Sequence, residues 1–515
     1  MRANDLLDAI GNAKDEYVHA AKINQKKRIP GWVKGFSAAA CLVLMVSVGI
    51  FALAMMGGRA GGGGNSNNGL TYMSYDGPVL PLTLREENSS ITAQRNIDFD
   101  FSPYFPREEF YEDSKGEMKP YIQYDDEAIV TDSYTLTNNS SEDVSVTAIY
   151  PFVGSLREKE YYPSVSIDGI KVDPELNYGQ YSGGFTGILG ASNNEAVTSV
   201  NLAPCDSFDS YEKLLSSGEY MASAFDEPPT LDQPVTVYKM SDYEYTSDPE
   251  ATNPTLEMEF YIDPDKTTVL TYGINGGTYN SEDGYCARHN GAIEYRPNAS
   301  PERREPGNAY VIFVGEDIDS YTLQGYKNGG CNDGDELDDL GCTVTRYETT
   351  LGDILKELVF EEWDYDDKAD AQTLFELTSE LIVTCGPLGD LVQRYDDGML
   401  DTMIAEASSH SRVIYLEFDV VIPAGSSVKI DAVTVKEASI DFVGDDTERN
   451  GYDMATQLGS NIIFTEQTAS ISEYSEIEII RQNFGFDLSA GITEVVLDMN
   501  EPHYWMEVRK IRTNE

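Results

Sequence analysis

The sequence predicts a mainly β protein of immunoglobulin-like or other β-sandwich modules, with a helical insert and one transmembrane helix. Three observations lead to this fold class. Segments with alternating apolar and polar residues recur after residue 70, which is typical of strands with one buried face. Residues 349–410 carry apolar side chains at helical spacing. One uncharged run, residues 36–56, is long enough to span a membrane.

Size and charge narrow the possible classes of protein. A chain of 515 residues is longer than a single core usually supports, so we expect more than one domain. The formal net charge is −53. Such acidity excludes a typical nucleic-acid binder, which needs a basic face against phosphates.

The apolar run is FSAAACLVLMVSVGIFALAMM, and its 21 residues match a hydrocarbon core of about 30 Å. Lys26, Lys27, Arg28 and Lys34 precede it. The positive-inside rule therefore places residues 1–35 in the cytoplasm as a short tail and the rest of the chain outside. A cleaved signal peptide is the alternative, which the length of the run disfavours. The predicted location is the cell membrane, with the lipid bilayer as one partner.

The chain after the membrane divides by composition. Residues 57–69 read GGRAGGGGNSNNG, a flexible linker. We expect residues 70–348 to form a first β-rich part, residues 349–410 a helical insert, and residues 411–515 a second β-rich part.

Three segments of the outer part are predicted as β-hairpins with one buried face: 128–150, 255–275 and 413–436. The last two resemble each other, reading LEMEFYIDPDKTTVLTY and IYLEFDVVIPAGSSVKI. An internal duplication and a chance similarity both explain this likeness. Further strands are expected from residue 461 onward.

The helical insert is predicted from three periodic groups of apolar residues. A Gly-Pro pair at 386–387 should end the second helix. The groups are Leu351, Ile354, Leu355 and Leu358; Leu374, Leu377 and Leu381; and Met399, Met403 and Ala407.

Two regions resemble known families. The segment DLLDAIGNAKDEYVHAA, followed by KKR, Trp32 and SAAACLVLMVSV, resembles the leader of anti-sigma-like and unknown-function single-pass membrane proteins of Gram-positive bacteria. The pieces YTLTNNSSEDVSVTAIYPF, YSGGFTG, TTVLTYGINGG, GYDMATQLGSN and RQNFGFDL resemble uncharacterised membrane-anchored proteins of clostridia-type bacteria. The resemblance implies a membrane-anchored extracellular domain and no particular activity.

Motifs that carry chemistry are few. The sequence has no GxxxxGK[ST], HExxH, GxSxG or CxxC motif, and no catalytic or cofactor-binding residue is assigned. Asp446, Glu448 and Asn450 occupy positions 1, 3 and 5 of a loop that resembles a calcium loop, so Ca²⁺ is the one candidate cofactor. Cys331 and Cys342 bracket a short acidic loop and are the candidate disulfide.

These features favour a non-enzymatic binding, sensing or structural role for the outer part, with an unknown extracytoplasmic protein or glycan as partner. One alternative is a carboxylate-dependent hydrolase of cell-wall or other glycans. Another is a transmembrane regulator that acts through residues 1–35. A cleft with two acids, one of raised pKa, would favour the enzyme. A closed sandwich would favour binding or scaffolding.

Overall fold

The computed structural model describes residues 75–511, with gaps at 113–117, 124, 183–204, 206, 245, 275, 281–283, 290–306, 363–367, 385, 390–397 and 441–448. Strands account for 48% of the structure, which confirms the prediction of a β-rich protein. The predicted membrane span at 36–56 lies outside the described residues. Within the described part, none of the helices combines the length and apolarity needed to cross a membrane.

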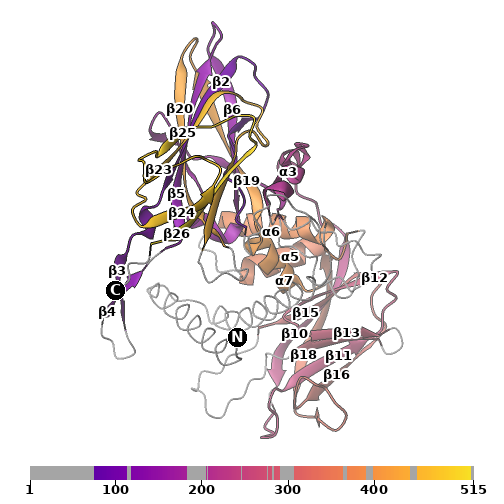
Figure 1. Ribbon diagram of the computed structural model, residues 1–515. Coiled ribbons are helices and arrows are strands. Elements are labelled where there is room, and N and C mark those ends of the chain that lie inside the picture. The colour runs from indigo at the N-terminus through magenta and orange to yellow at the C-terminus, as the bar shows by residue number, and fades with distance from the viewer. Residues whose placement is uncertain are drawn as a thin grey trace, which may run out of the picture. The chain divides into compact units, whose positions relative to one another are not determined.

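Two sheets that we call sandwich A enclose one hydrophobic core (Figure 1). The four-stranded sheet has the order β1 (Thr83–Leu84), β6 (Val144–Gly154), β19 (Arg412–Ile422) and β9 (Glu175–Tyr181). The seven-stranded sheet has the order β25 (Glu494–Val496), β23 (Ile463–Ser472), β2 (Ile91–Asp100), β5 (Glu127–Asn138), β20 (Ser427–Glu437), β7 (Ser164–Ile167) and β8 (Ile170–Lys171).

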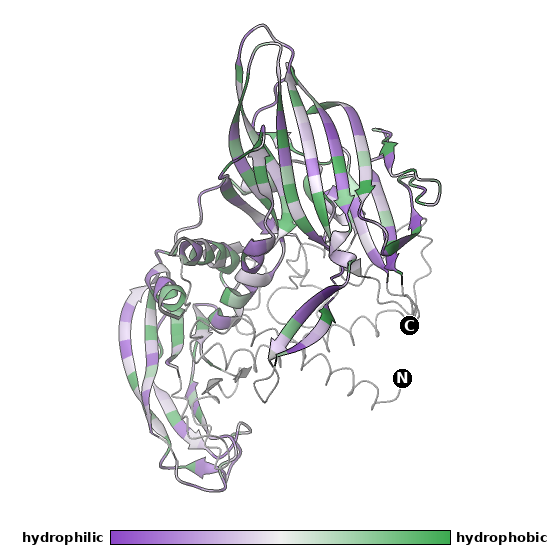
Figure 2. Cartoon of the chain, turned by 90° about the vertical axis from the view of Figure 1, so that its left-hand side faces the viewer, coloured by the Kyte–Doolittle hydropathy of each residue, from purple (hydrophilic) through white to green (hydrophobic). Residues whose placement is uncertain are grey.

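Alternation along the strands explains why sandwich A forms. Every second residue of β5 is buried along the whole strand, including Tyr134 and Leu136. Figure 2 shows the corresponding bands of apolar and polar residues along the long strands. All pairings within the two sheets are antiparallel except that of β2 with β23, which is parallel. The buried faces of the two sheets supply one core cluster, as expected for a sandwich.

Two further sheets form sandwich B. Its core contains Met258 and Phe260 from one sheet and Val311 and Phe313 from the other. The first sheet has the order β12 (Thr267–Tyr272), β15 (Ala309–Gly315), β10 (Pro234–Glu244) and β18 (Gly341–Thr350). The second has the order β13 (Gly276–Asn280), β14 (Gly284–His289), β11 (Thr255–Phe260), β16 (Tyr321–Tyr326) and β17 (Glu336–Leu337).

Three helices cover the other face of the first sheet of sandwich B: α5 (Leu351–Glu362), α6 (Lys368–Thr384) and α7 (Leu400–Ser409). All three lie inside the range 349–410. Tyr310 and Ile312 of β15 pack against the helices, while Val311 and Phe313 point into the core of sandwich B. Because both of its faces are buried, β15 has an uninterrupted apolar sequence instead of an alternating one.

The remaining elements are short. A small sheet has the order β21 (Ser439–Ile440), β22 (Asn450–Ala455), β26 (His503–Lys510) and β24 (Ile477–Gln482). The other helices in the described part of the chain are α3 (Phe208–Leu215) and α4 (Glu219–Ser223), with 3-10 turns η1 (Ser102–Tyr104) and η2 (Leu156–Tyr161). The hairpin of β3 (Arg107–Glu112) and β4 (Met118–Gln123) belongs to a separate compact unit.

The three predicted hairpins are wrong, since none of the strand pairs concerned is hydrogen-bonded together. In each case, β5–β6, β11–β12 and β19–β20, the two strands enter different sheets. The connection is a β-arch that crosses from one sheet of a sandwich to the other. Alternation of apolar and polar residues indicates that a strand has one buried face. Because both sheets of a sandwich have a buried face, the pattern alone cannot show with which neighbouring strand it pairs.

Sandwich B and its helices are inserted into sandwich A. Strands β1, β2 and β5 to β9 of sandwich A precede the insertion, and β19 follows it directly. The returning strands take interior positions, since β19 lies between β6 and β9 and β20 between β5 and β7. Residues from both the expected first and the expected second β-rich part therefore build sandwich A.

Candidate functional site

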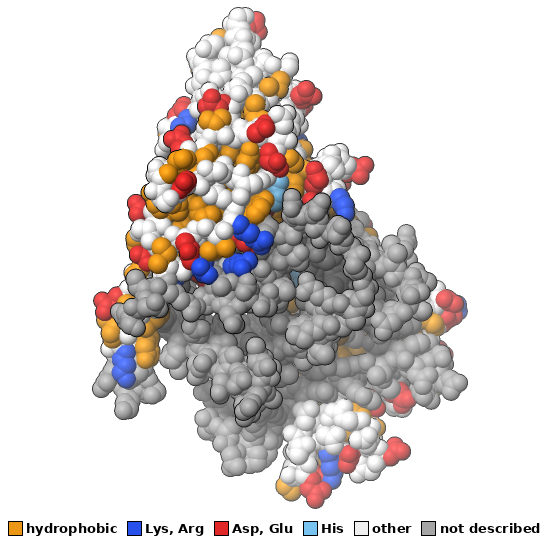
Figure 3. Space-filling model, in the orientation of Figure 1, with side chains coloured by type: hydrophobic (Ala, Val, Ile, Leu, Met, Phe, Trp, Pro, Cys, Tyr) orange, Lys and Arg blue, Asp and Glu red, His pale blue; other side chains and the backbone are white. Residues whose placement is uncertain are grey.

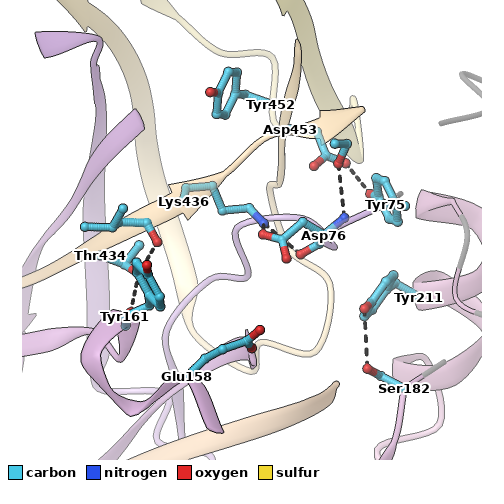
Figure 4. Close-up of polar contacts among 12 residues, drawn as sticks. Tyr75, Asp76, Glu158, Tyr161, Ser182, Tyr211, Thr434, Lys436, Tyr452 and Asp453 are labelled. Carbon is cyan, nitrogen blue, oxygen red and sulfur yellow. Dashed lines mark hydrogen bonds and ion pairs between the residues drawn. The ribbon is translucent and has the colours of Figure 1, made fainter. Parts of the chain in front are cut away.

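The candidate site is a small pocket on sandwich A, formed by a segment before β1 together with β6, η2 and β20 (Figure 4). Its volume of about 50 Å³ holds a few water molecules. The polar side chains in its wall are Asp76, Glu158, Tyr161, Tyr162, Thr434, Lys436 and Glu437.

An ion pair links the two sides of the pocket. The Lys436 ammonium donates to the carbonyl oxygen of Asp76 at 2.7 Å and also to its Oδ2. Figure 4 shows Lys436 reaching from its strand toward Asp76. Burial raises the pKa of the Asp76 carboxyl, while Lys436 opposes that shift. The backbone N–H of Asp76 donates to Ser439 Oγ, which fixes the segment further.

Glu158, Glu437 and Tyr161 also line the pocket. Glu158 Oε2 accepts hydrogen bonds from the backbone N–H and the hydroxyl of Ser155, at 3.2 and 2.7 Å, and so caps η2. Burial, followed by repulsion from Asp76 and Glu158, raises the pKa of Glu437. The pKa of the Tyr161 hydroxyl is also raised, by burial and by nearby glutamates.

The chemistry available in this pocket is limited. It offers two carboxyl groups with raised pKa values, Asp76 and Glu437, which is the property of a general acid. However, Asp76 is bound to Lys436 and Glu158 is bound to Ser155. A volume of about 50 Å³ does not enclose a sugar ring, so a glycan could only lie across its mouth.

A second polar cluster lies beside the pocket. Asp453 Oδ2 accepts a hydrogen bond from Tyr75 and lies 2.8 Å from His503 Nε2. The His503 ring stacks on Phe208 with 4.0 Å between ring centroids. Asp453 also contributes to the raised pKa of Asp76. This cluster ties the segment before β1 to β22, β26 and α3.

The predicted calcium ligands are only partly described. Asp446 and Glu448 lie outside the described residues. Asn450 is buried at the start of β22, where it pairs with Val508 of β26. Among the residues that the structure describes, no group of three or more His, Cys, Asp or Glu side chains could hold a metal ion.

The two candidate disulfide cysteines are separate thiols in the structure, without the bond expected from the sequence. Cys342 lies in β18 and packs against the core of sandwich B. Cys331 lies in the preceding loop, with its sulfur 4.0 Å from the carbonyl oxygen of Asn328. Bracketing a short loop brings two cysteines close in sequence, but their directions depend on the strand and the loop.

Acidic and basic side chains are distributed differently on the face that Figure 3 shows. Figure 3 shows acidic side chains scattered over the visible face of the strands, with basic ones gathered near β24 and β26. There Glu507 is buried and accepts from Arg481 Nη2 at 2.6 Å, while Arg449 lies 3.9 Å from it. Part of this positive charge is therefore neutralised within the protein.

Comparisons with known proteins identify no relative. No family model matches the sequence, and neither the curated proteins nor the solved structures searched contain a match.

The residues of the pocket were not singled out from the sequence. Asp76 and Lys436 are 360 positions apart, and neither lies in a motif. Lys436 and Glu437 end an alternating segment, where a charged residue is ordinarily solvent-exposed. A lysine on the buried face of a predicted strand was the only available signal.

Proposed function

We propose that this chain is a membrane-anchored extracytoplasmic protein with a binding, sensing or structural role, rather than an enzyme. The anchor is the apolar run at 36–56, and the linker at 57–69 connects it to the β-rich part. The working surface is that of the two sandwiches, and its partner is a protein or glycan of the cell envelope.

The observation that carries this proposal is that acidic groups of the pocket are already engaged in hydrogen bonds and an ion pair within the protein. A glycan hydrolase needs two carboxyl groups free to reach one scissile bond. Of the two carboxyl groups with raised pKa, Asp76 is held by Lys436, which leaves Glu437 without a second free acid of raised pKa, and the volume is about 50 Å³. Both sandwiches are filled by apolar side chains. These features support a scaffold that presents surfaces.

The topology is tested by adding protease to intact protoplasts. Residues beyond about 60 should be digested, while residues 1–35 stay protected until the membrane is opened with detergent. A tail that is digested from outside would contradict the anchor and its orientation. The partner is then sought by cross-linking in the native envelope, with a variant lacking residues 1–69 as the unanchored control.

The second candidate, a carboxylate-dependent glycan hydrolase, is favoured by the raised pKa values of Asp76 and Glu437. Its test is release of reducing sugar ends from purified cell wall by the wild type and by Glu437→Gln. Activity that the substitution abolishes, with unchanged thermal melting, would replace the binding proposal. A wild type without activity would leave the binding role as the better account.

A further inference from the structure

β18 lies at the edge of sandwich B among the strands that the structure describes. β18 is the last strand of its sheet, and β10 is its only neighbour there among the described residues. All ten residues of β18 are half-buried or exposed. Edge strands of this length present a row of backbone donors and acceptors to a further strand.

The backbone register shows which groups face outward. Leu351 N–H donates to Gln233 O at 3.0 Å, just beyond the paired strands. Because hydrogen bonding alternates along an antiparallel pair, Thr349, Tyr347 and Thr345 bond toward β10. Pro234, opposite Thr350, has no N–H to give, which agrees with this register.

The free edge of β18 therefore consists of the N–H and C=O groups of the alternate residues. The side chains of two of them are exposed, Arg346 at 44% and Glu348 at 71%. Within one chain, Arg346 Nη2 lies 2.9 Å from Glu348 Oε1 and 2.8 Å from Asp317 Oδ2, so a pair across two copies would extend an existing network of charges. The outward-facing groups belong to Val344, Arg346, Glu348 and Thr350.

This edge is complementary to itself. An antiparallel pair of two β18 strands, related by a twofold axis at Tyr347, places Arg346 opposite Glu348 of the second copy, and Glu348 opposite Arg346. Both residues belong to the outward-facing set, so backbone bonds and opposite charges coincide in one register. Val344 then faces Thr350 of the second copy.

We propose that β18 is a homotypic docking edge, at which two copies of this chain join their four-stranded sheets into one continuous eight-stranded sheet. β18 carries one basic and one acidic residue, in contrast to a chain of net charge −53. The two charges of β18 itself therefore cancel, while Asp317, which binds Arg346, adds one negative charge beside the edge. Repulsion between the acidic bodies is screened beyond about 8 Å at physiological salt.

The pairing is tested with engineered cysteines in the full-length chain, held in detergent micelles because of the apolar run at 36–56. Tyr347→Cys should form disulfide-linked dimers under mild oxidation, because residues on the axis face each other across a pair without backbone bonds. Val421→Cys, 62% exposed on another sheet, controls for random collision. Equal dimer yields from these two variants would overturn the proposal.

The register is tested without changing Tyr347. A mixture of Thr345→Cys and Thr349→Cys proteins, carrying different affinity tags, should cross-link to each other at least fivefold more than either does to itself. In the proposed register residue 345 faces 349, whereas two copies of residue 349 are roughly 14 Å apart. Self-linking of each variant as strong as the mixed product would contradict the register.

The charges provide an independent readout. Glu348→Lys brings a cation opposite Arg346 of the second copy and should lower the mixed cross-linking at least fivefold. Glu466→Lys changes the net charge equally on an exposed site of sandwich A and should leave the yield unchanged. If both substitutions have the same effect, the complementarity of Arg346 and Glu348 plays no part.

Discussion

Lys436 binds both the main-chain carbonyl and the carboxylate of Asp76, a residue 360 positions earlier in the chain. The contact fastens the segment before β1 onto β20. Lys436 is buried, with its side chain 11% exposed, and Asp76 provides its counter-charge. The segment that leads to the predicted anchor is therefore held by electrostatics as well as by apolar packing.

Replacing this lysine tests that fastening. Lys436→Met should lower the free energy of unfolding by about 2 kcal/mol, because a half-buried carboxylate loses its donor. The double variant Lys436→Met/Asp76→Asn should recover part of the loss. Urea unfolding of the wild type, the single variants Lys436→Met and Asp76→Asn, and the double variant gives the coupling energy, and a coupling near zero would show that the two residues act independently.

A second ion pair, in the core of sandwich A, should contribute more to the free energy of unfolding than the pair of Lys436 and Asp76. Arg95 and Asp132 are fully buried and form two hydrogen bonds of 2.8 Å. Arg95→Met should destabilise sandwich A by about 3–5 kcal/mol, because Asp132 remains as a buried charge. The matched surface variant Arg509→Met removes an exposed pair with Glu478 and should cost less than about 1 kcal/mol. Chemical denaturation measures the free energy of unfolding of both variants. Equal losses of stability would contradict the larger role given to the buried ion pair.

The carboxyl group of Asp401, in the first turn of α7, has a pKa raised by burial to about 6. The folded protein therefore binds this proton more tightly than the unfolded chain. The resulting stability is present at about pH 4 and is lost as the pH rises through 6. Asp401→Asn should raise the melting temperature at pH 7.5 and leave it unchanged near pH 4. An equal shift at both values would rule out the carboxyl as the cause.

His410 should act in the opposite direction over the same range. Burial, followed by the nearby Arg412, lowers the pKa of its imidazole to about 4. Its contribution to stability is thus present above about pH 6.5 and is lost as the pH falls toward 4. His410→Phe should flatten the stability profile between these values. Thermal melts at half-unit pH steps measure it, and an unaltered slope would exclude His410.

The reactivity of the Cys342 thiol can be tested by alkylation. Burial raises the pKa of Cys342 to about 11, so little thiolate exists near neutral pH. We expect iodoacetamide at pH 8 to leave Cys342 largely unmodified in the folded protein and to modify it after denaturation. Mass spectrometry of non-reduced peptides provides the control: a peptide joined through Cys331 and Cys342 would restore the disulfide predicted from the sequence.

Single helices and strands could be predicted from the sequence better than the pairing between strands. The spacing of Leu351, Ile354, Leu355 and Leu358 predicts a helix because one face of α5 is buried, and all four side chains are. In contrast, β15 escaped notice because Val311 and Ile312 are buried on opposite faces, so no alternation appears. Pairing depends on contacts between distant segments, and local periodicity carries no information about them.

The candidate site shows the same limit. The calcium hypothesis depended on residues close together in sequence, whereas the pocket joins Asp76 with Lys436 and Glu437. Its acids acquire raised pKa values from burial and mutual repulsion, which only the folded arrangement creates. A count of acidic residues, in a chain that holds 89 of them, could not identify these few.

The insertion of sandwich B into sandwich A imposes an order of assembly. After β9 ends at Tyr181, about 230 residues must be made before β19 begins at Arg412. At roughly 5–20 residues per second, synthesis of that stretch takes on the order of 10–50 s. Throughout this delay β5 and β6 lack their central neighbours and expose unpaired edges, whereas the strands of sandwich B are complete once β18 has been made, before β19 begins. The strands of sandwich A that are made first are thus the last to gain all their neighbours, and they are the ones for which protection by a chaperone would be most needed.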